Sequence, residues 1–486
     1  MLNRLSFVVL FLFFCCNEDT IDPVLFGTIQ GKVTFATDGA AAAGVEITTN
    51  PGTSVVYTAE DGTFLLEVPV GTYALAAKLE GFKTESRSIT VNRDASTNVD
   101  FVISNDNVLP DSPADPTPSH NALDIATEVT LKWSAPAADR ETLTFDLTLY
   151  EGTDSNPIKK IESFRDTFLV VQDLKYNTNY FWQVVAKSAG TESTNGPLWH
   201  FKTKALPDNR FLFVRAVDAN TEIFSSNESG TTSVRITKAP QEQLHPQFSN
   251  NGQTIFFTAK APTGDHIYRI QADGTGLVQL TTLPAIGYHS TGRNFCLSPD
   301  NGKIMYSHYD KLYTIDTNGS NLTLVSTAPA GRHFRECDWT SVGNRVVVET
   351  VGSLPYESEI RLIELDNPQD SIVVGDLPGI VKNPSFSLDG NSILYTVDAA
   401  GFQSADGRQL DSRVMLLNLT TRAELNLSRE KTPGTNDLNP RFTSNGASVL
   451  VENVSNAGGT SNVTAITVSD QKRKLLFENA AMPDSF

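Results

Sequence analysis

The phrase Phe248-Ser-Asn-Asn-Gly252, followed directly by the apolar run TIFFTA, recurs in varied form through the rest of the chain. Each copy starts with a large apolar residue, passes through a polar turn to a glycine, and continues as an apolar strand. Successive copies begin about 42 to 56 residues apart, and strand-rich units of this length are typical of a solenoid, propeller or array. The starting residues, called anchors below, are Phe248, Leu297, Trp339, Phe386 and Phe442.

Each repeat carries four strand signals. The strand after the glycine is the second, and a third follows it, as in HIYRI (266–270) and KLYTI (311–315). A polar turn such as Ala272-Asp-Gly-Thr275 then leads to a fourth, as in LVQLTT (277–282). Alternating residues predict one packed face for each strand. Four-stranded units of this length predict the blades of a β-propeller.

The number of blades depends on an incomplete first unit. Its segments 210–216, 221–226 and 233–237 supply strands two to four, and no first strand precedes them. The final residues Met482-Pro-Asp-Ser-Phe486 look like the first strands HPQF, NPSF and NPRF of other repeats. We therefore predict that the last residues complete the first blade, which closes a ring of six and leaves no open sheet edge.

Residues 205–486 resemble the WD-like repeats of TolB-type propellers, which follow the pattern PxFSxDGxxIxF with a later IYxxxxDGxxxxxLT. The resemblance implies the fold of this region. It does not imply one function, because propellers host many.

Composition and charge limit the classes of partner. The chain has 486 residues and a net charge of −18, and its longest basic run is Lys472-Arg473-Lys474. Such a charge argues against a nucleic-acid partner. Four cysteines do not form a disulfide scaffold. Cys296 and Cys337 belong to the first strands of neighbouring blades, where we expect buried free thiols, with a disulfide as the alternative.

Residues 1–16 have the composition of a targeting segment. Arg4 supplies one positive charge, and Leu5–Phe14 is apolar except for one serine. This run is too short to span a bilayer as a helix and is typical of a signal peptide. Because it ends at Cys15 and Cys16, the segment resembles a bacterial lipoprotein signal, which implies lipidation of Cys16. An ordinary cleaved signal peptide is the alternative.

Residues 17–26 form a predicted tether that opens with Asn17-Glu18-Asp19. Acidic residues directly after a lipidated cysteine resemble the surface-export signal of Bacteroidota lipoproteins. This resemblance implies a lipid anchor in the outer membrane and a place at the cell surface. The periplasmic face of that membrane and a simple solvated tether are the alternatives.

Two small β-sandwich domains are predicted before the propeller. Residues 27–103, with the text TAEDGTFLLEVPVGTYALAAKLEGF, resemble the carboxypeptidase regulatory-like domain, a non-catalytic β-sandwich. The Pro- and Asp-rich residues 104–118 are typical of an extended linker.

Residues 119–204 resemble a fibronectin type III domain. The resemblance rests on Trp133 in VTLKW, on the pattern LxxxTxYxWxVxA from Leu174, and on a closing GPLWHF segment. It places Tyr180 at the tyrosine corner of that family and implies that the tryptophans are core residues rather than a sugar-stacking surface.

Catalytic signatures are few. The sequence lacks the GxSxG elbow, the HExxH motif, a Walker loop and a CxxC zinc pair. We therefore predict no enzyme activity, no cofactor and no resident metal. Oligogalacturonate lyases are similar propellers that hold a metal with several histidines, so a lyase-type or related carbohydrate-active enzyme is one alternative. The histidines to consider are His245, His266, His289, His308 and His333.

The candidate binding residues lie three positions before the anchors. They are His245, Asn294, Glu336, Asn383 and Asn439. Because blades share one geometry, we expect them to form a ring at one mouth of the central channel, beside long loops (284–293, 329–335, 431–437). Arg335 is expected to recognise an anionic group there. The alternative is that these side chains only cap turns.

The sequence as a whole predicts an all-β, monomeric, outer-membrane lipoprotein with two β-sandwiches and a six-bladed propeller. The predicted function is non-enzymatic: the propeller holds a protein or glycan partner at the cell envelope. A periplasmic TolB-like envelope protein is a further alternative, although the α/β domain of TolB has no counterpart in this sequence.

Overall fold

The computed structural model describes residues 24–104, 109–135, 143–188, 193–289, 295–366 and 369–486. Every regular element among these residues is a β-strand, so the predicted all-β class is confirmed. The chain divides into two compact units between Lys204 and Ala205, where the sequence predicts the start of the propeller. Within the described ranges, no helix is long and apolar enough to cross a membrane.

The first domain is a sandwich of two four-stranded sheets. Alternating residues of the facing strands, such as Ile29, Leu66 and Leu75, fill the space between the sheets. One sheet has the order β4 (Thr63–Pro69), β1 (Phe26–Phe35) and β7 (Ser96–Asn98), with β8 (Phe101–Ile103) also paired to β1. The other has the order β3 (Val56–Tyr57), β2 (Glu46–Asn50), β5 (Gly71–Lys78) and β6 (Glu85–Val91).

The second domain is also a sandwich. Its larger sheet has the order β10 (Ala122–Ile125), β17 (Trp199–Thr203), β15 (Asn179–Lys187), β12 (Thr144–Glu151) and β13 (Pro157–Phe164), with β16 (Ser193–Asn195) paired to β15. The smaller sheet has the order β14 (Phe168–Val171), β11 (Val129–Ser134) and β9 (Ala114–Thr117). Strand β9 corrects the predicted linker 104–118, because the backbone of its last residues pairs with β11.

Aromatic packing in this second sandwich agrees with the prediction of core tryptophans. The rings of Trp182 and Trp199 lie 4.7 Å apart, and Trp133 packs against Trp182; all three are buried. The hydroxyl of buried Tyr180 accepts a hydrogen bond of 2.8 Å from the backbone N–H of Lys175. This bond to a residue just upstream is the geometry of a tyrosine corner.

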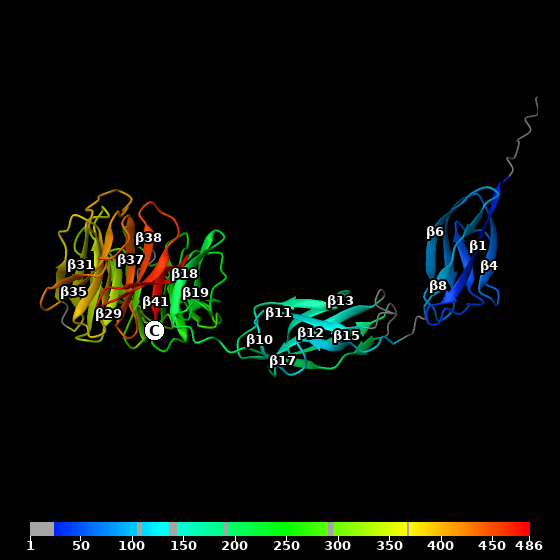
Figure 1. The fold of residues 1–486 in the computed structure, drawn as a ribbon, viewed down its shortest axis with the longest axis horizontal. Coiled ribbons are helices and arrows are strands. Elements are labelled where there is room, and N and C mark those ends of the chain that lie inside the picture. Colours follow the sequence, from blue (N-terminus) through cyan, green and yellow to red (C-terminus); the bar gives the residue numbers. More distant parts are fainter. Residues whose placement is uncertain (1–23, 105–108, 136–142, 189–192, 290–294, 367–368) are drawn as a thin grey trace, which may run out of the picture. The chain divides into compact units, whose positions relative to one another are not determined.

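The propeller consists of six four-stranded antiparallel sheets (Figure 1). Blade 1 contains β41 (Ala481–Ser485), β18 (Phe211–Val217), β19 (Asn220–Ser226) and β20 (Val234–Arg235). Blade 2 contains β21 (Gln243–Phe248), β22 (Thr254–Ala259), β23 (His266–Gln271) and β24 (Val278–Gln279), and blade 3 contains β25 (Phe295–Leu297), β26 (Lys303–His308), β27 (Lys311–Asp316) and β28 (Thr323–Thr327).

The remaining blades follow the same order from the inner to the outer strand. Blade 4 contains β29 (His333–Thr340), β30 (Arg345–Val351), β31 (Ser358–Glu364) and β32 (Gln369–Val374). Blade 5 contains β33 (Val381–Phe386), β34 (Ser392–Asp398), β35 (Ser412–Asn418) and β36 (Glu424–Asn426). Blade 6 contains β37 (Thr435–Phe442), β38 (Ser448–Ser455), β39 (Asn462–Thr467) and β40 (Arg473–Phe477).

Six apolar clusters fill the six spaces between neighbouring blades. Most second strands contribute residues to two clusters. In β22, for example, Ile255 and Phe257 pack toward blade 1, whereas Phe256 between them packs toward blade 3. The prediction of one packed face per strand is therefore wrong for these strands. Both of their faces are covered, because each blade lies between two others, and the strands are apolar at nearly every position.

Strand β41 closes the ring as predicted. It pairs with β18 in antiparallel register, with Phe211 opposite Ser485 (Figure 1). The Asp484 carboxylate accepts a hydrogen bond of 2.8 Å from the backbone N–H of Phe248, and the rings of Phe248 and Phe486 lie 4.6 Å apart. Phe486 also lies against Gly252, whose φ of +67° and contact with that ring leave no space for a Cβ.

Candidate functional site

The predicted ring residues share one position on the inner strands, as the repeat geometry requires. His245, Asn383 and Asn439 each precede a proline, and each has a left-handed backbone, with φ between 49° and 56°. The strand register shifts at each of these three dipeptides. Proline cannot donate a ladder hydrogen bond, so the inner strand bulges there and leaves two residues unpaired.

Side chains from these bulges bond to one another across the blades. Asn383 Nδ2 donates to Glu336 Oε2 (2.7 Å) and to Asn439 Oδ1 (3.2 Å). Asn439 Nδ2 donates to Glu452 Oε2 (2.9 Å), which also accepts the backbone N–H of Met482 (3.1 Å). This chain of hydrogen bonds joins blades 4, 5, 6 and 1, and it differs from the turn capping that was the alternative.

The predicted place of this ring at a channel mouth is wrong. His245, Glu336 and Asn383 are buried, and the side chains of His245, Asn439 and Met482 line a void of only about 10 Å³. A void of that size holds about one water molecule. The bulges turn these side chains toward neighbouring blades, where most of them have little access to solvent. Asn294 lies outside the described residues.

Arg335 also differs from its expected place. Its side chain is buried, and its Nη1 lies 3.2 Å from Oε1 of buried Glu349. Lys382 lies beside this pair and is partly buried. Burial and the positive charge of Arg335 lower the pKa of Lys382 to about 8, although the negative charges of Glu349 and Glu336 oppose the shift. Replacing Arg335 and Glu336 together by Ala should therefore lower the stability of the propeller, because the loss of Arg335 leaves the buried charge of Glu349 uncompensated.

The two propeller cysteines lie together between blades 3 and 4. Cys296 and Cys337 are buried free thiols in one apolar cluster, and Cys337 Sγ donates to the backbone oxygen of Met305 at 3.7 Å. Burial and the hydrogen bond with Cys337 raise the pKa of the Cys296 thiol well above its ordinary value. A buried, protonated thiol is a poor nucleophile.

We therefore expect Ellman's reagent to label neither thiol in the native chain beginning at residue 17. Two equivalents should react after unfolding in guanidinium without a reductant. Rapid labelling of the native protein would contradict the burial, and no labelling after unfolding would mean that Cys296 and Cys337 had formed a disulfide.

An aromatic cluster lies at the end of the blades where second strands turn into third strands. Tyr288 belongs to the loop before β25, Tyr309 to the two-residue hairpin between β26 and β27, and His333 to the start of β29. The rings of Tyr288 and His333 are stacked, with centroids 3.6 Å apart and planes at 8°. Tyr309 meets His333 edge-on at 5.4 Å. We call these three residues the aromatic platform.

Backbone hydrogen bonds fix the platform. The N–H of Tyr288 donates to Nδ1 of His333 at 3.0 Å, so that nitrogen carries no proton. The backbone of Tyr309 donates to Ile286 O (2.6 Å) and accepts from Phe334 N (3.0 Å). Burial lowers the pKa of His333, which favours this neutral form, although the charge of Asp310 opposes the shift.

The platform is open to solvent although its backbone is fixed. Tyr288 is 38% exposed and Tyr309 is 43% exposed. Tyr309 has a φ of 54°, a conformation that favours glycine and is costly for a bulky residue. The repeat pattern does not point to either tyrosine; the available signal in the sequence is the pairing of tyrosine with histidine at 288–289 and 308–309.

The histidines considered as metal ligands gather only in part. His289 and His308 lie near the platform, but each donates a ring N–H to a backbone oxygen, of Ser353 (2.9 Å) and Pro284 (2.8 Å) respectively. Among the residues that the structure describes, no group of three or more His, Cys, Asp or Glu side chains is arranged to hold a metal ion.

A cavity of about 350 Å³ lies at the end of the channel formed by the turns between first and second strands. These turns and the turns of the platform lie at opposite ends of the blades, because adjacent strands are antiparallel. The polar residues that line the cavity from the inner strands are Gln247, Asp338, Ser385, Arg441, Asp484 and Ser485. Asp338 and Asp484 each accept a backbone N–H from the next blade, so these carboxylates are part of the frame.

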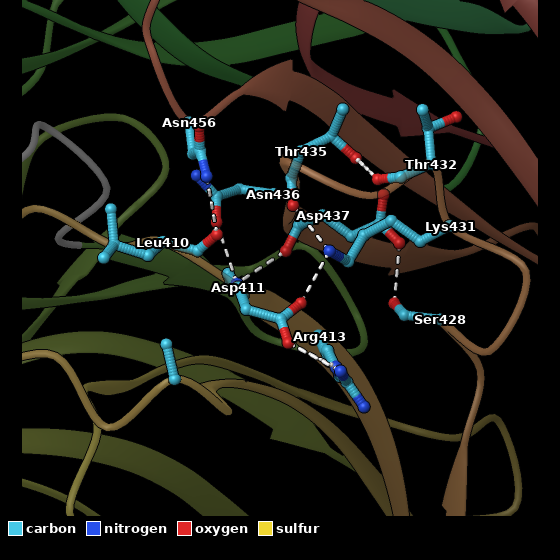
Figure 2. Close-up of polar contacts among 12 residues, drawn as sticks. Leu410, Asp411, Arg413, Ser428, Lys431, Thr432, Thr435, Asn436, Asp437 and Asn456 are labelled. Carbon is cyan, nitrogen blue, oxygen red and sulfur yellow. Dashed lines mark hydrogen bonds and ion pairs between the residues drawn. The ribbon is translucent and has the colours of Figure 1, made fainter.

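The loop before β37 is also fixed, as Figure 2 shows. Lys431 Nζ donates to Asp411 (2.7 Å), which also accepts from Arg413 (2.6 Å). Partial burial raises the pKa of Asp411, but these hydrogen bonds outweigh it and the pKa is lowered. Residues 435–437 of the predicted loop belong to β37 itself, and the carboxylate of buried Asp437 accepts from Ser428 Oγ (2.6 Å) (Figure 2).

Residues 28–104 match the family model of the carboxypeptidase regulatory-like domain. The predicted resemblance of the first sandwich is confirmed. No curated protein matches this sequence.

Solved propellers are similar to the chain at low identity. TolB from Acinetobacter baumannii is 12% identical, with a TM-score of 0.45, over 79% of this chain and 89% of its own. A putative TolB from Agrobacterium tumefaciens is 13% identical, with a TM-score of 0.42, over 56% of this chain and 90% of its own. An oligogalacturonate lyase in complex with manganese is 11% identical, with a TM-score of 0.37, over 56% and 74%.

Proposed function

We propose that this protein is a non-enzymatic binding module of the cell envelope, whose propeller holds a protein or glycan partner. The observation that carries the proposal is the aromatic platform, in which exposed rings are fixed by backbone hydrogen bonds. Exposed side chains on turns that a rigid scaffold fixes are where binding usually occurs. Aromatic side chains of this kind supply contact area at low entropic cost.

The two sandwiches are proposed to act as spacers between the membrane anchor and the propeller. We assign the second to the fibronectin type III kind, and the hydrogen bond between Tyr180 and Lys175 supports this. Neither sandwich needs a site of its own in this scheme.

A direct test of binding uses the chain from residue 17 as bait. The tagged protein is incubated with solubilised envelope proteins and, separately, with envelope polysaccharides. The proposal is supported if the intact chain retains either class and a chain lacking residues 205–486 does not. Retention of neither class overturns it.

Anchoring through lipid on Cys16 is part of the proposal, and the signal-like residues 1–16 support it. Both cysteines lie outside the described residues. Replacing Cys15 and Cys16 together by Ala should move the protein from the membrane to the soluble fraction, because the acyl chains that hold it would be lost. The measurement is a membrane fractionation with immunoblotting, and single Cys15→Ala serves as the control that keeps the anchor. A double variant that still sediments with membranes would contradict lipidation.

A further inference from the structure

The aromatic platform is preorganised for ligand binding. The loop that carries Tyr288 is bonded to His333, and the hairpin that carries Tyr309 is bonded on both sides. Little side-chain or loop entropy is therefore lost when something stacks on these rings. Tyr309 also adopts a backbone conformation that would cost less with glycine or asparagine. Such strain is expected where the side chain has a use.

The chemistry of the platform combines flat apolar faces with hydrogen-bonding edges. The tyrosine rings offer apolar area and a hydroxyl. Because Nδ1 of His333 accepts a hydrogen bond and carries no proton, the other ring nitrogen of the neutral imidazole is an N–H donor. A sugar ring has the matching pattern, with C–H groups on its faces and hydroxyl groups around its edge. An open platform, in contrast to a deep pocket, suits a chain that continues past it.

Charges beside the platform are neutralised within the protein. Lys311 pairs with Asp310 at 2.9 Å. The Arg332 guanidinium pairs with Glu359 at 3.1 Å and also donates to backbone oxygens of Thr350 and Glu357. Among the described residues beside the platform, these pairs leave no local excess of positive charge to attract a polyanion, and the net charge of −18 repels one at long range.

We infer that Tyr288, Tyr309 and His333 form a subsite for a neutral polysaccharide chain. One sugar unit stacks on the Tyr288 ring, and a neighbouring unit packs against the Tyr309 ring, whose plane is steeply inclined to that of Tyr288. The inference rests on the proposed binding function and narrows it to one class of partner. A protein partner is less well matched, because the core of a protein interface is a larger, desolvated apolar patch, whereas paired charges surround this platform.

The test is native gel electrophoresis of the chain from residue 17 in gels that contain a soluble polysaccharide. The probes are a mixed-linkage β-glucan, xyloglucan, arabinoxylan and galactomannan, with polygalacturonate as the anionic comparison. We expect at least one neutral probe to retard the protein. Tyr288→Ala and Tyr309→Ala should each weaken that affinity about tenfold, because each removes one stacked ring.

Two sets of variants control the experiment. Tyr288→Phe and Tyr309→Phe keep the ring and should retain most of the affinity, which separates stacking from a loss of hydroxyl bonds. Tyr57→Ala removes a tyrosine that is 64% exposed in the first sandwich and should have no effect. Thermal unfolding checks that each alanine variant is folded.

Each outcome supports or overturns the inference. Retardation that the alanine variants abolish supports it. Equal retardation of all variants places glycan binding elsewhere, so the inference fails while the proposed function stands. If polygalacturonate alone retards the protein, the inference that the ligand is a neutral polysaccharide is overturned. Retention of an envelope protein without any glycan binding overturns the inference and keeps the proposed function. Release of new sugar chain ends from any probe overturns the proposed non-enzymatic function itself.

Discussion

Deletion of residues 481–486 is expected to lower the unfolding free energy of the propeller by roughly 5 kcal/mol. The loss combines the apolar contacts of Phe486 with Phe248 and the ladder bonds between β41 and β18. It also exposes an unpaired edge of β18 in blade 1. The measurement is denaturant unfolding of the isolated 205–486 region and of the full chain.

The control for this deletion is Leu388→Ala, which shortens a propeller side chain that is exposed in a turn. It should change the unfolding midpoint little. A smaller variant, Phe486→Ala, should fall between the control and the deletion. If the deleted chain unfolded at the same denaturant concentration as the intact one, β41 would not be the strand that completes blade 1.

Asp437→Asn should destabilise the propeller by about 3 to 5 kcal/mol. Arg473 binds Asp437 through two parallel hydrogen bonds of 2.8 and 2.9 Å, and Asn453 Nδ2 donates to the same carboxylate at 2.8 Å. Asparagine has almost the same shape, but it removes the charge and one of the acceptors. The partly buried guanidinium of Arg473 would then lack its counter-charge.

Asp411→Asn is the matched control, because it breaks a similar pair of ionic contacts in a more exposed place (Figure 2). Its cost should be clearly smaller, since water can replace part of what is lost. Chemical denaturation of both variants at pH 7 and constant salt makes the comparison. Equal costs would mean that burial does not set the contribution of Asp437.

Much of the propeller could be predicted from the repeated phrase alone. The spacing of the anchors gives four strands per unit, and the likeness of Met482-Pro to His245-Pro and Asn383-Pro gives the closing strand. The sequence pattern could not show that β22 packs on both faces. Alternation of apolar and polar residues marks a strand with one solvent-exposed face, whereas β22 is covered by neighbouring blades on both faces.

The sites were harder to predict than the strands. The shared position of Glu336, Asn383 and Asn439 follows from the repeat, but their depth in the channel depends on bulges that a pattern of residues does not reveal. The platform was missed for a different reason. Tyr288, Tyr309 and His333 come from three separate loops, and only the packing of blade 3 against blade 4 brings them together.

Closure by β41 also has a consequence for the order of events during synthesis. The strands of blade 1 at positions 211–226 emerge from the ribosome long before their partner at 481–485. Pairing of β41 with β18 closes a loop that contains the whole propeller. The entropic cost of this loop closure is therefore smallest when the other blades have already formed. Until residues 481–485 have been synthesised, blade 1 lacks its inner strand and β18 keeps an unpaired edge. The ring of blades is therefore completed only when residues 481–485 pair with β18.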